Sequence, residues 1–421
     1  MNKIQTLIIA IGCSCISMSA NAQVVSDVVS IQPGPGYTNQ VFYNMNSGEL
    51  SNITHTDWDI AFQLRGFAAS ILINSKNNVK LWKANKDISQ WATMMTSDTT
   101  GIVNNPAYEL VNSDTSWDFG AFSSTNDATN PFDLGWGTYD FATHIISGDS
   151  VYFIKIDSAD IRKIKIESLS SGTYNFRFAN LDGSNEIVAA LSKSAFQGKF
   201  FAYYSLVNNV SIDREPIYNA WDLTFCQYLA ISPVRYKVSG ILSNDSVFVE
   251  KAYPVDVNTA IAGSGTSSSK INTIGYDWKT YDLNSNSWII SDSLVYFVTD
   301  RQNVVWKMVF TGFDGASTGN FYFDKSPAVA SGLIENSSIK TFGLYPNPAH
   351  DNVRMMLQME QSGNTLISII DSKGSVAHTI STSLQSGLQS VDLNVSDLVG
   401  GLYQIVVRQG NEIQTSRLLV D

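Results

Sequence analysis

The chain has 421 residues, of which 44% are hydrophobic and 11% aromatic, a composition that can build real cores and is unlike that of a disordered chain. Its net charge of −11 argues against a protein that binds nucleic acid or an anionic membrane, and no run of Lys and Arg supplies a local exception. Abundant aromatic residues, mixed with Ser, Thr, Asn and Gly, favour strands and turns, so the predicted fold class is all-β and mainly antiparallel.

The first 22 residues have the pattern of a cleavable signal peptide. Lys3 precedes the short apolar run Leu7–Ile11, and Ala20–Ala22 forms a small-residue cleavage site. The alternative is a lipoprotein that is cleaved before Cys13 or Cys15. No later segment reaches the roughly 18–20 apolar residues that span a bilayer. The prediction is therefore an exported chain without a transmembrane segment.

After loss of the signal peptide one cysteine, Cys226, remains, so an internal disulfide is not possible. Cys226 ends a strand-like run and is expected to be a small buried residue. A catalytic thiol is not expected, because nothing near it in sequence would lower its pKa. The chain also lacks the His-Glu-x-x-His, Gly-x-Ser-x-Gly, Cys-x-x-Cys and phosphate-loop motifs. We therefore expect a protein that is not an enzyme.

An internal repeat organises the middle of the chain. The run Trp58–Phe62 recurs as Trp221–Phe225, and each copy follows an aromatic strand, Val41–Tyr43 in the first and Phe201–Tyr204 in the second. Further strands recur downstream in the same order. The repeat predicts two tandem β domains, residues 23–185 and 186–325.

The two copies differ in length, and the extra residues of the first copy are placed in the polar stretch 93–130. The best helix candidate is the segment Glu186–Phe196. The repeated tryptophans, Trp58 and Trp221, are expected to pack in the cores. The acidic residues that follow them, Asp59 and Asp222, are expected on the opposite face, in a turn or at a strand edge.

Residues 326–338 are small and polar, which is typical of a linker, and residues 339–421 contain short alternating strands. This pattern predicts a small Ig-like β-sandwich at the end of the chain. The predicted strands are Val353–Met359, Leu366–Asp371, Val391–Val395, Tyr403–Val407 and Ser416–Val420.

Four ordered motifs in this last domain carry a resemblance to a known family. They resemble the type A sorting domain of the type IX secretion system of Bacteroidetes, and in chain order they are Tyr345-Pro346-Asn347-Pro348, Asp371-Ser372-Lys373-Gly374, Gly400-Gly401-Leu402-Tyr403 and the final Leu418–Val420. The resemblance implies that the secretion machinery is a partner, that the chain crosses the outer membrane, and that the product is secreted or stays on the cell surface. The alternative is an ordinary Ig-like adhesion module.

The first copy carries a second resemblance. Gly36–Tyr43, Trp58–Phe62 and Val151–Phe153 resemble the HmuY-like family, exported β-rich proteins of Bacteroidetes whose founding group binds haem. The resemblance covers residues 31–184, and the second copy more loosely. It implies a ligand-binding protein that takes haem or a related hydrophobic ligand. The alternative function is a surface structural or interaction module, for adhesion or carbohydrate binding, that takes no haem.

Haem iron needs an axial His, Met, Cys or Tyr. Two histidines, His55 and His144, lie between the signal peptide and the sorting domain, and the second copy has Tyr218 and Asn286 in their places. His55 and His144 are therefore the candidate haem ligands; the alternative is that both are structural or surface residues. The many aromatic residues could instead line a groove for a sugar or a peptide. The fallback ligands are Met45, Met94 and Met95.

Overall fold

The computed structural model describes residues 27–157, 160–328, 339–359, 361–371, 375–410 and 412–420. The predicted signal peptide and residues 329–338 of the predicted linker lie outside them. Antiparallel sheets dominate, which confirms the all-β class. In this described part, no helix has the length and apolar character needed to cross a membrane. The helices are short 3-10 turns: η1 (Pro35–Tyr37), η2 (Ile88–Thr93), η3 (Thr96–Thr99), η4 (Ala121–Ser123), η5 (Lys193–Phe196) and η6 (Gly315–Ser317).

Two sheets face each other in the first sandwich, and one core cluster joins them. The larger sheet runs in the order β13 (Ile187–Ser192), β12 (Thr173–Asn180), β11 (Ile161–Ser170), β10 (Ser150–Lys155), β6 (Lys80–Asp87) and β7 (Glu109–Leu110), with the hairpin β8 (Gly137–Asp140) and β9 (Ile145–Gly148) attached to β11. The smaller sheet runs in the order β15 (Val210–Ile212), β14 (Phe201–Ser205), β4 (Ile60–Gln63) and β5 (Ile71–Ile73).

The second sandwich repeats this plan around its own core cluster. Its larger sheet runs in the order β1 (Asp27–Ile31), β24 (Phe321–Pro327), β23 (Val305–Phe313), β22 (Val295–Thr299), β18 (Phe248–Ala252) and β19 (Thr266–Ser268). Its smaller sheet runs in the order β17 (Tyr236–Ser243), β16 (Leu223–Ala230), β2 (Asn39–Asn44) and β3 (Gly48–Thr54). A separate hairpin pairs β20 (Lys279–Asp282) with β21 (Ser287–Ile290).

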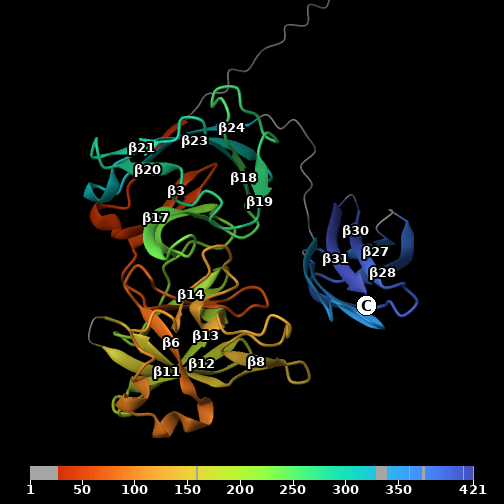
Figure 1. The fold of residues 1–421 in the computed structure, drawn as a ribbon, viewed down its shortest axis with the longest axis horizontal. Coiled ribbons are helices and arrows are strands. Elements are labelled where there is room, and N and C mark those ends of the chain that lie inside the picture. Colours follow the sequence, from red (N-terminus) through yellow and green to blue (C-terminus); the bar gives the residue numbers. More distant parts are fainter. Residues whose placement is uncertain are drawn as a thin grey trace, which may run out of the picture.

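The two repeats exchange the strand that precedes their Trp-Asp motif. β2 lies directly before the first motif in sequence, yet it pairs with β16 of the second sandwich. β14 lies before the second motif, yet it pairs with β4 of the first sandwich. Figure 1 shows the exchange as the red strand β3 in the body that is otherwise green and cyan. The second sandwich is therefore closed by the N-terminal arm, residues 27–57.

The buried aspartate of each motif holds the exchanged strand in place. The Asp59 carboxylate, 2% exposed, accepts a 2.7 Å hydrogen bond from the backbone N–H of Leu206, just after β14. The Asp222 carboxylate, fully buried, accepts one of the same length from the N–H of Met45, just after β2. Each aspartate thus ties its own repeat to the strand that arrives from the other one.

Replacing Asp222 by Ala is expected to lower the free energy of unfolding by about 1–3 kcal/mol, because the buried N–H of Met45 loses its acceptor. The matched change Asp222→Asn keeps an oxygen at this place and is expected to cost less. Urea denaturation of residues 23–328 measures both changes. Equal stability of Asp222→Ala and the unchanged chain would contradict this role of the carboxylate.

Because of the exchange, neither sandwich consists of a single continuous repeat. The repeat predicts a domain boundary between residues 185 and 186, but strands from both sides of that boundary belong to each sandwich. β13 and β14 follow residue 185 but belong to the first sandwich, whereas β1, β2 and β3 belong to the second. The helix predicted at Glu186–Phe196 is wrong, because Ile187–Ser192 forms β13 on the edge of β12 and a short 3-10 turn follows. β24 also extends to Pro327, inside the predicted linker.

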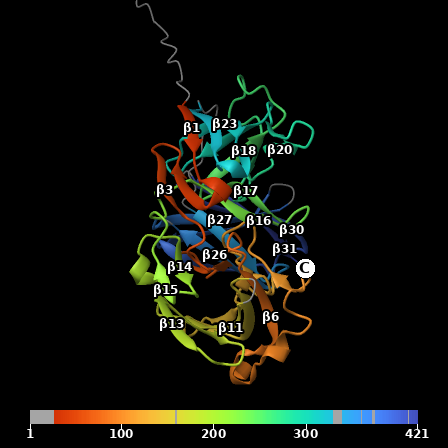
Figure 2. The same ribbon diagram turned by 90° about the vertical axis from the view of Figure 1, so that its left-hand side faces the viewer.

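The sandwiches stack through their smaller sheets, so the four sheets form successive layers, as both views show (Figures 1 and 2). Side chains from both sheets and their flanking loops share one apolar cluster that includes Phe42, Trp58, Tyr203 and Trp221. The extra segment of the first copy joins this contact, since the indole N–H of Trp117 donates a 2.9 Å hydrogen bond to the carbonyl of Ser243. The two repeats therefore form an interlocked pair.

The C-terminal domain is a sandwich of two sheets around its own core, as its sequence pattern predicts. A strand forms at each of the five predicted segments; four segments are strand throughout, and β29 ends one residue before Val395. One sheet runs in the order β25 (Ile339–Tyr345), β26 (Asn352–Met359) and β29 (Gly387–Asn394). The other runs in the order β28 (Val376–Leu384), β27 (Gly363–Asp371), β30 (Gly401–Gln409) and β31 (Glu412–Val420).

Candidate functional site

The hairpin of β8 and β9 forms one wall of a pocket in the first sandwich, which we call the hairpin pocket. Its volume is about 220 Å³. The opposite walls come from the β4–β5 and β11–β12 connections and from the start of η5. The lining residues that matter below are Phe67, Tyr139, His144, Ile146, Leu169 and Lys193.

Local hydrogen bonds fix the turn that carries His144. The side chain of Asp140 accepts hydrogen bonds from the backbone N–H groups of Ala142 (2.8 Å) and Thr143 (3.3 Å), and its carbonyl accepts from the N–H of His144 at 2.8 Å. His144 adopts φ 57°, a left-handed conformation that non-glycine residues seldom take. The turn thereby sets the direction in which the imidazole leaves the backbone.

A tyrosine holds the imidazole by one nitrogen. The Tyr139 hydroxyl lies 2.7 Å from Nδ1 of His144. Nε2 of His144 makes no hydrogen bond with the described residues. The Tyr139 ring also packs edge-on against Phe67, with centroids 5.2 Å apart. A histidine whose second nitrogen is held in this way is oriented to present its other nitrogen to a ligand.

Lys193 brings a positive charge to the same pocket without a counter-ion. Its ammonium lies 5.4 Å from the centroid of the Tyr174 ring and forms no hydrogen bond or ion pair in the part of the chain that the structure describes. Burial lowers the pKa of Lys193 to about 8, so the group is still mostly charged at neutral pH. The pocket therefore combines an aromatic wall, an imidazole and an unpaired cation.

The matching hairpin of the second sandwich carries a lysine. The two hairpins align residue by residue, so Lys279 stands where Gly137 stands and Asn286 where His144 stands. The Lys279 ammonium lies 4.2 Å from the Trp278 ring centroid and donates a 2.8 Å hydrogen bond to the carbonyl of Ser239. The two repeats thus share a hairpin but not its chemistry.

Burial lowers the pKa of Lys279 to about 7, whereas an exposed lysine has a pKa of 10.5. At pH values between about 7 and 10.5 the unfolded chain binds more protons than the folded chain, so the free energy of unfolding should rise with pH. Lys279→Met removes the titrating group. We expect the stability of the unchanged chain relative to Lys279→Met to increase by roughly 1–4 kcal/mol between pH 7 and pH 10. Urea denaturation at several pH values measures it, and a constant difference would contradict it.

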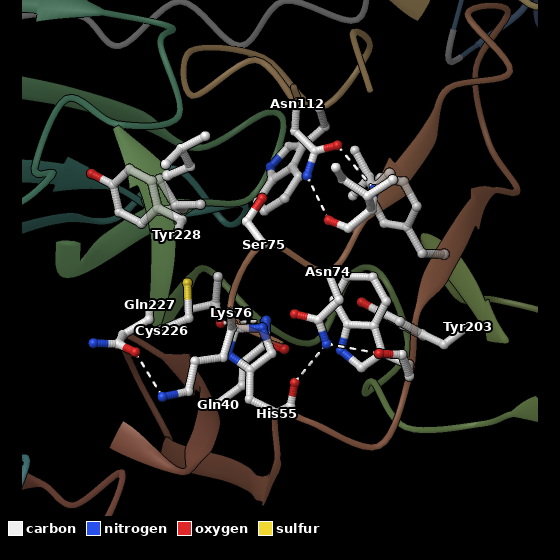
Figure 3. Close-up of a pocket in the computed structure, with 18 of the residues that line it drawn as sticks. Gln40, His55, Asn74, Ser75, Lys76, Asn112, Tyr203, Cys226, Gln227 and Tyr228 are labelled. Carbon is white, nitrogen blue, oxygen red and sulfur yellow. Dashed lines mark hydrogen bonds between the residues drawn. The ribbon is translucent and has the colours of Figure 1, made fainter. Parts of the chain in front are cut away.

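The other candidate ligand, His55, lies elsewhere. It is 5% exposed and stacks on Trp58 at 6.1 Å between ring centroids, in a cavity of about 80 Å³ between the two sandwiches, which we call the interface cavity (Figure 3). Burial lowers the pKa of His55 well below its usual value, and the charges of Arg214 and Lys76 lower it further. The two cavities have no lining residue in common, so His55 and His144 do not form one bis-histidine site.

The remaining sequence candidates are mostly buried. Met45 and Met94 lie in apolar cores, whereas Met95 is 58% exposed in the segment before η3. Cys226 is buried, as expected, and burial raises its pKa to about 12, which leaves the thiol unreactive at neutral pH. Of the nine tryptophans none is exposed; Trp117 and Trp288 are half-buried and the other seven are buried. This burial does not favour a tryptophan-lined sugar groove.

Sequence reasoning did not find Lys193, because it lies in a segment expected to be helical. A signal for His144 was present, however. Tyr139 and Asp140 recur as Tyr281 and Asp282 with the same spacing to the next hairpin strand, whereas the turn Phe141–His144 is replaced throughout by Leu283–Asn286. The two strands of the hairpin are thus joined by turns of equal length, and the first copy alone places an imidazole at the last turn position.

The sorting motifs meet at one end of the last domain. The side-chain oxygen of Asn347 accepts a 2.8 Å hydrogen bond from the N–H of Leu419 in β31, and Ala349 forms a bridge with Val420. The Tyr403 hydroxyl donates a 2.7 Å hydrogen bond to the carbonyl of Val399, next to Gly401. Pro346 and Pro348 flank Asn347, and the side chains of Tyr345 and Leu402 lie outside the described set.

Comparison with known proteins identifies this domain. Residues 343–421 match the family described as "Secretion system C-terminal sorting domain". The match confirms the type IX sorting domain and indicates that the protein is delivered to the cell surface or secreted by a bacterium of the Bacteroidetes. None of the curated proteins matches the chain significantly.

Two solved structures are distantly similar. Dimeric latent PorU from Porphyromonas gingivalis is 11% identical, with a TM-score of 0.19, over 66% of this chain and 26% of that one. The BSP domain of a biofilm associated protein is 11% identical, with a TM-score of 0.18, over 92% of this chain and 82% of that one. The chain thus covers well under two thirds of the PorU structure. At these TM-scores neither similarity bears on fold or function.

Proposed function

We propose that the exported cargo is a ligand-binding protein of the cell surface or medium, and that its ligand is haem or a related planar, hydrophobic molecule with acidic groups. The observation that carries the proposal is the hairpin pocket, where Tyr139 orients His144 beside the unpaired Lys193. Export by a sorting domain supports it, because a protein delivered outside the cell can meet such a ligand.

The chemistry of the pocket fits this ligand class. An imidazole nitrogen is a common axial ligand of haem iron, and Nε2 of His144 is free to take that role. The Phe67 and Tyr139 rings offer an aromatic surface to a flat macrocycle. Lys193 offers a charge to a carboxylate. Because the pocket volume is about 220 Å³, a molecule as large as haem would extend beyond its walls.

A haem titration of residues 23–328, followed at the Soret band, tests the proposal. We expect a saturable shift with one haem per chain, because the second hairpin has Lys279 and Asn286 where the first has Gly137 and His144. A titration without a change in the Soret band would exclude haem as the ligand. Saturation at two haems per chain would contradict the assignment to the hairpin of the first sandwich alone.

One observation favours the alternative function, a structural or interaction module on the surface. The exchanged strands interlock the two sandwiches, and this pairing would resist their separation whether or not a ligand binds. If the haem titration is flat, capture of a cell-surface polymer by residues 23–328 would support this alternative.

A further inference from the structure

Both repeats contribute residues to the interface cavity. Trp58 and Trp221, the first residues of the two Trp-Asp motifs, line it together with His55 and Tyr228 (Figure 3 labels the last two). Its volume is about 80 Å³, which is far below the range of about 300–1,000 Å³ that holds drug-sized ligands. A few water molecules or one small ion would fill it.

Several buried polar atoms of this lining have no hydrogen-bond partner. They are Nε1 of Trp58, Nε1 of Trp221, the hydroxyl of Tyr228 and Nδ1 of His55, in side chains that are 6%, 2%, 8% and 5% exposed. An indole N–H can only donate a hydrogen bond, and a phenol can donate one. Buried polar groups almost always have partners, so the cavity calls for a hydrogen-bond acceptor.

Positive charge surrounds the cavity. The Arg214 side chain is fully buried and its guanidinium lies 5.9 Å from the centroid of the Trp58 ring. Lys76 donates to neutral acceptors, the carbonyl of Gly36 at 2.7 Å and the amide oxygen of Gln227 at 2.6 Å, and it has no carboxylate partner among the residues that the structure describes. The charges of Arg214, Lys76 and Lys237 all act on His55.

Two carboxyl groups, those of Glu215 and Asp114, also line the cavity, and both accept hydrogen bonds from other donors. The Glu215 carboxyl accepts hydrogen bonds from the N–H of Phe201 at 2.7 Å and from the hydroxyl of Tyr203 at 3.0 Å, and burial raises its pKa to about 7. Asp57 pairs with Arg214 at 3.3 Å. Asp114 accepts from the N–H of Ile231 at 3.1 Å. None of these bonds uses the unpaired indole or phenol donors.

We propose that the interface cavity binds one compact anion, a halide or a short carboxylate, between the indole N–H groups of Trp58 and Trp221. An anion can accept several hydrogen bonds, so one ion between the two indoles would satisfy both of their N–H groups. A water molecule would also need acceptors for its own two protons, which an anion does not need. The anion would contact both repeats and so join the two sandwiches at their centre, independently of any ligand in the hairpin pocket.

NMR of residues 23–328 with ¹⁵N-labelled tryptophan tests the proposal. Sodium bromide and sodium acetate are titrated in turn, at ionic strength held constant with gluconate, which is too large for the cavity. We expect the Nε1–H signals of Trp58 and Trp221 to move together and to saturate. The signal of Trp136, whose indole donates to the carbonyl of Ala69 at 3.0 Å, serves as the control and should stay in place.

Trp58→Phe and Trp221→Phe assign the two signals, and each should weaken the saturable shift of the other. Saturation with bromide alone, or with acetate alone, tells which class of anion fits. Shifts that are absent, or linear in concentration, would overturn the proposal. If a variant does not fold, crystals of the unchanged chain soaked in bromide decide: an anomalous peak between the indoles supports the site, and ordered water alone overturns it.

Discussion

A chain that starts at residue 58 is expected to retain a folded first sandwich and to lose the second. The missing N-terminal arm supplies β1 on the edge of the larger sheet, and it supplies β2 and β3 next to β16 in the smaller one. Its residues Val41, Phe42 and Tyr43 are at most 1% exposed. Loss of one buried aromatic side chain costs about 3–5 kcal/mol, and a whole domain has about 5–15 kcal/mol of stability. The arm therefore contributes more free energy of folding than the second sandwich can lose and still stay folded.

Limited proteolysis and thermal unfolding of residues 23–328 and 58–328 measure this effect. In the shorter chain we expect rapid cleavage within residues 221–328 and protection of residues 58–212. A synthetic peptide of residues 24–57, added to the shorter chain, should restore protection, whereas a peptide with Val41, Phe42 and Tyr43 all changed to Ser should not. Protection of both halves without the arm would contradict the strand exchange.

The sequence allowed the strands and their buried faces to be predicted well. Tyr174, Phe176 and Phe178 alternate with polar residues, and all three are buried in the first core. Trp58 and Trp221 are buried as expected, although between the sandwiches rather than inside either one. A two-residue period indicates which side chains point inward, and that information is local.

The strand exchange could not be predicted, because periodicity says nothing about which strand is the neighbour. Val41–Tyr43 and Phe201–Tyr204 have nearly the same character, so either could complete either sandwich. The choice depends on contacts far apart in sequence, such as the bond from the N–H of Met45 to Asp222. The interface cavity lies where the two sandwiches stack on each other. The position of His55 in this cavity could therefore not be predicted from the sequence.

Replacing His144 by Ala is expected to lower the affinity for haem by more than about 100-fold. Loss of a hydrogen-bond partner of a ligating histidine typically costs about 10–100-fold, and loss of the histidine itself should cost more. Tyr139→Phe, which removes the hydroxyl 2.7 Å from Nδ1, should fall in the smaller range. His144 is exposed in a hairpin turn, so the change to Ala should leave the fold intact.

The most direct test of the hairpin pocket compares haem titrations of His144→Ala and His55→Ala side by side at the Soret band, after urea denaturation has shown that both variants are folded. His55 lines a cavity of about 80 Å³ that cannot hold haem, so His55→Ala should bind haem like the unchanged chain while His144→Ala loses the saturable shift. Retained binding in His144→Ala, or loss of binding in His55→Ala alone, would contradict the assignment of the ligand to the hairpin pocket.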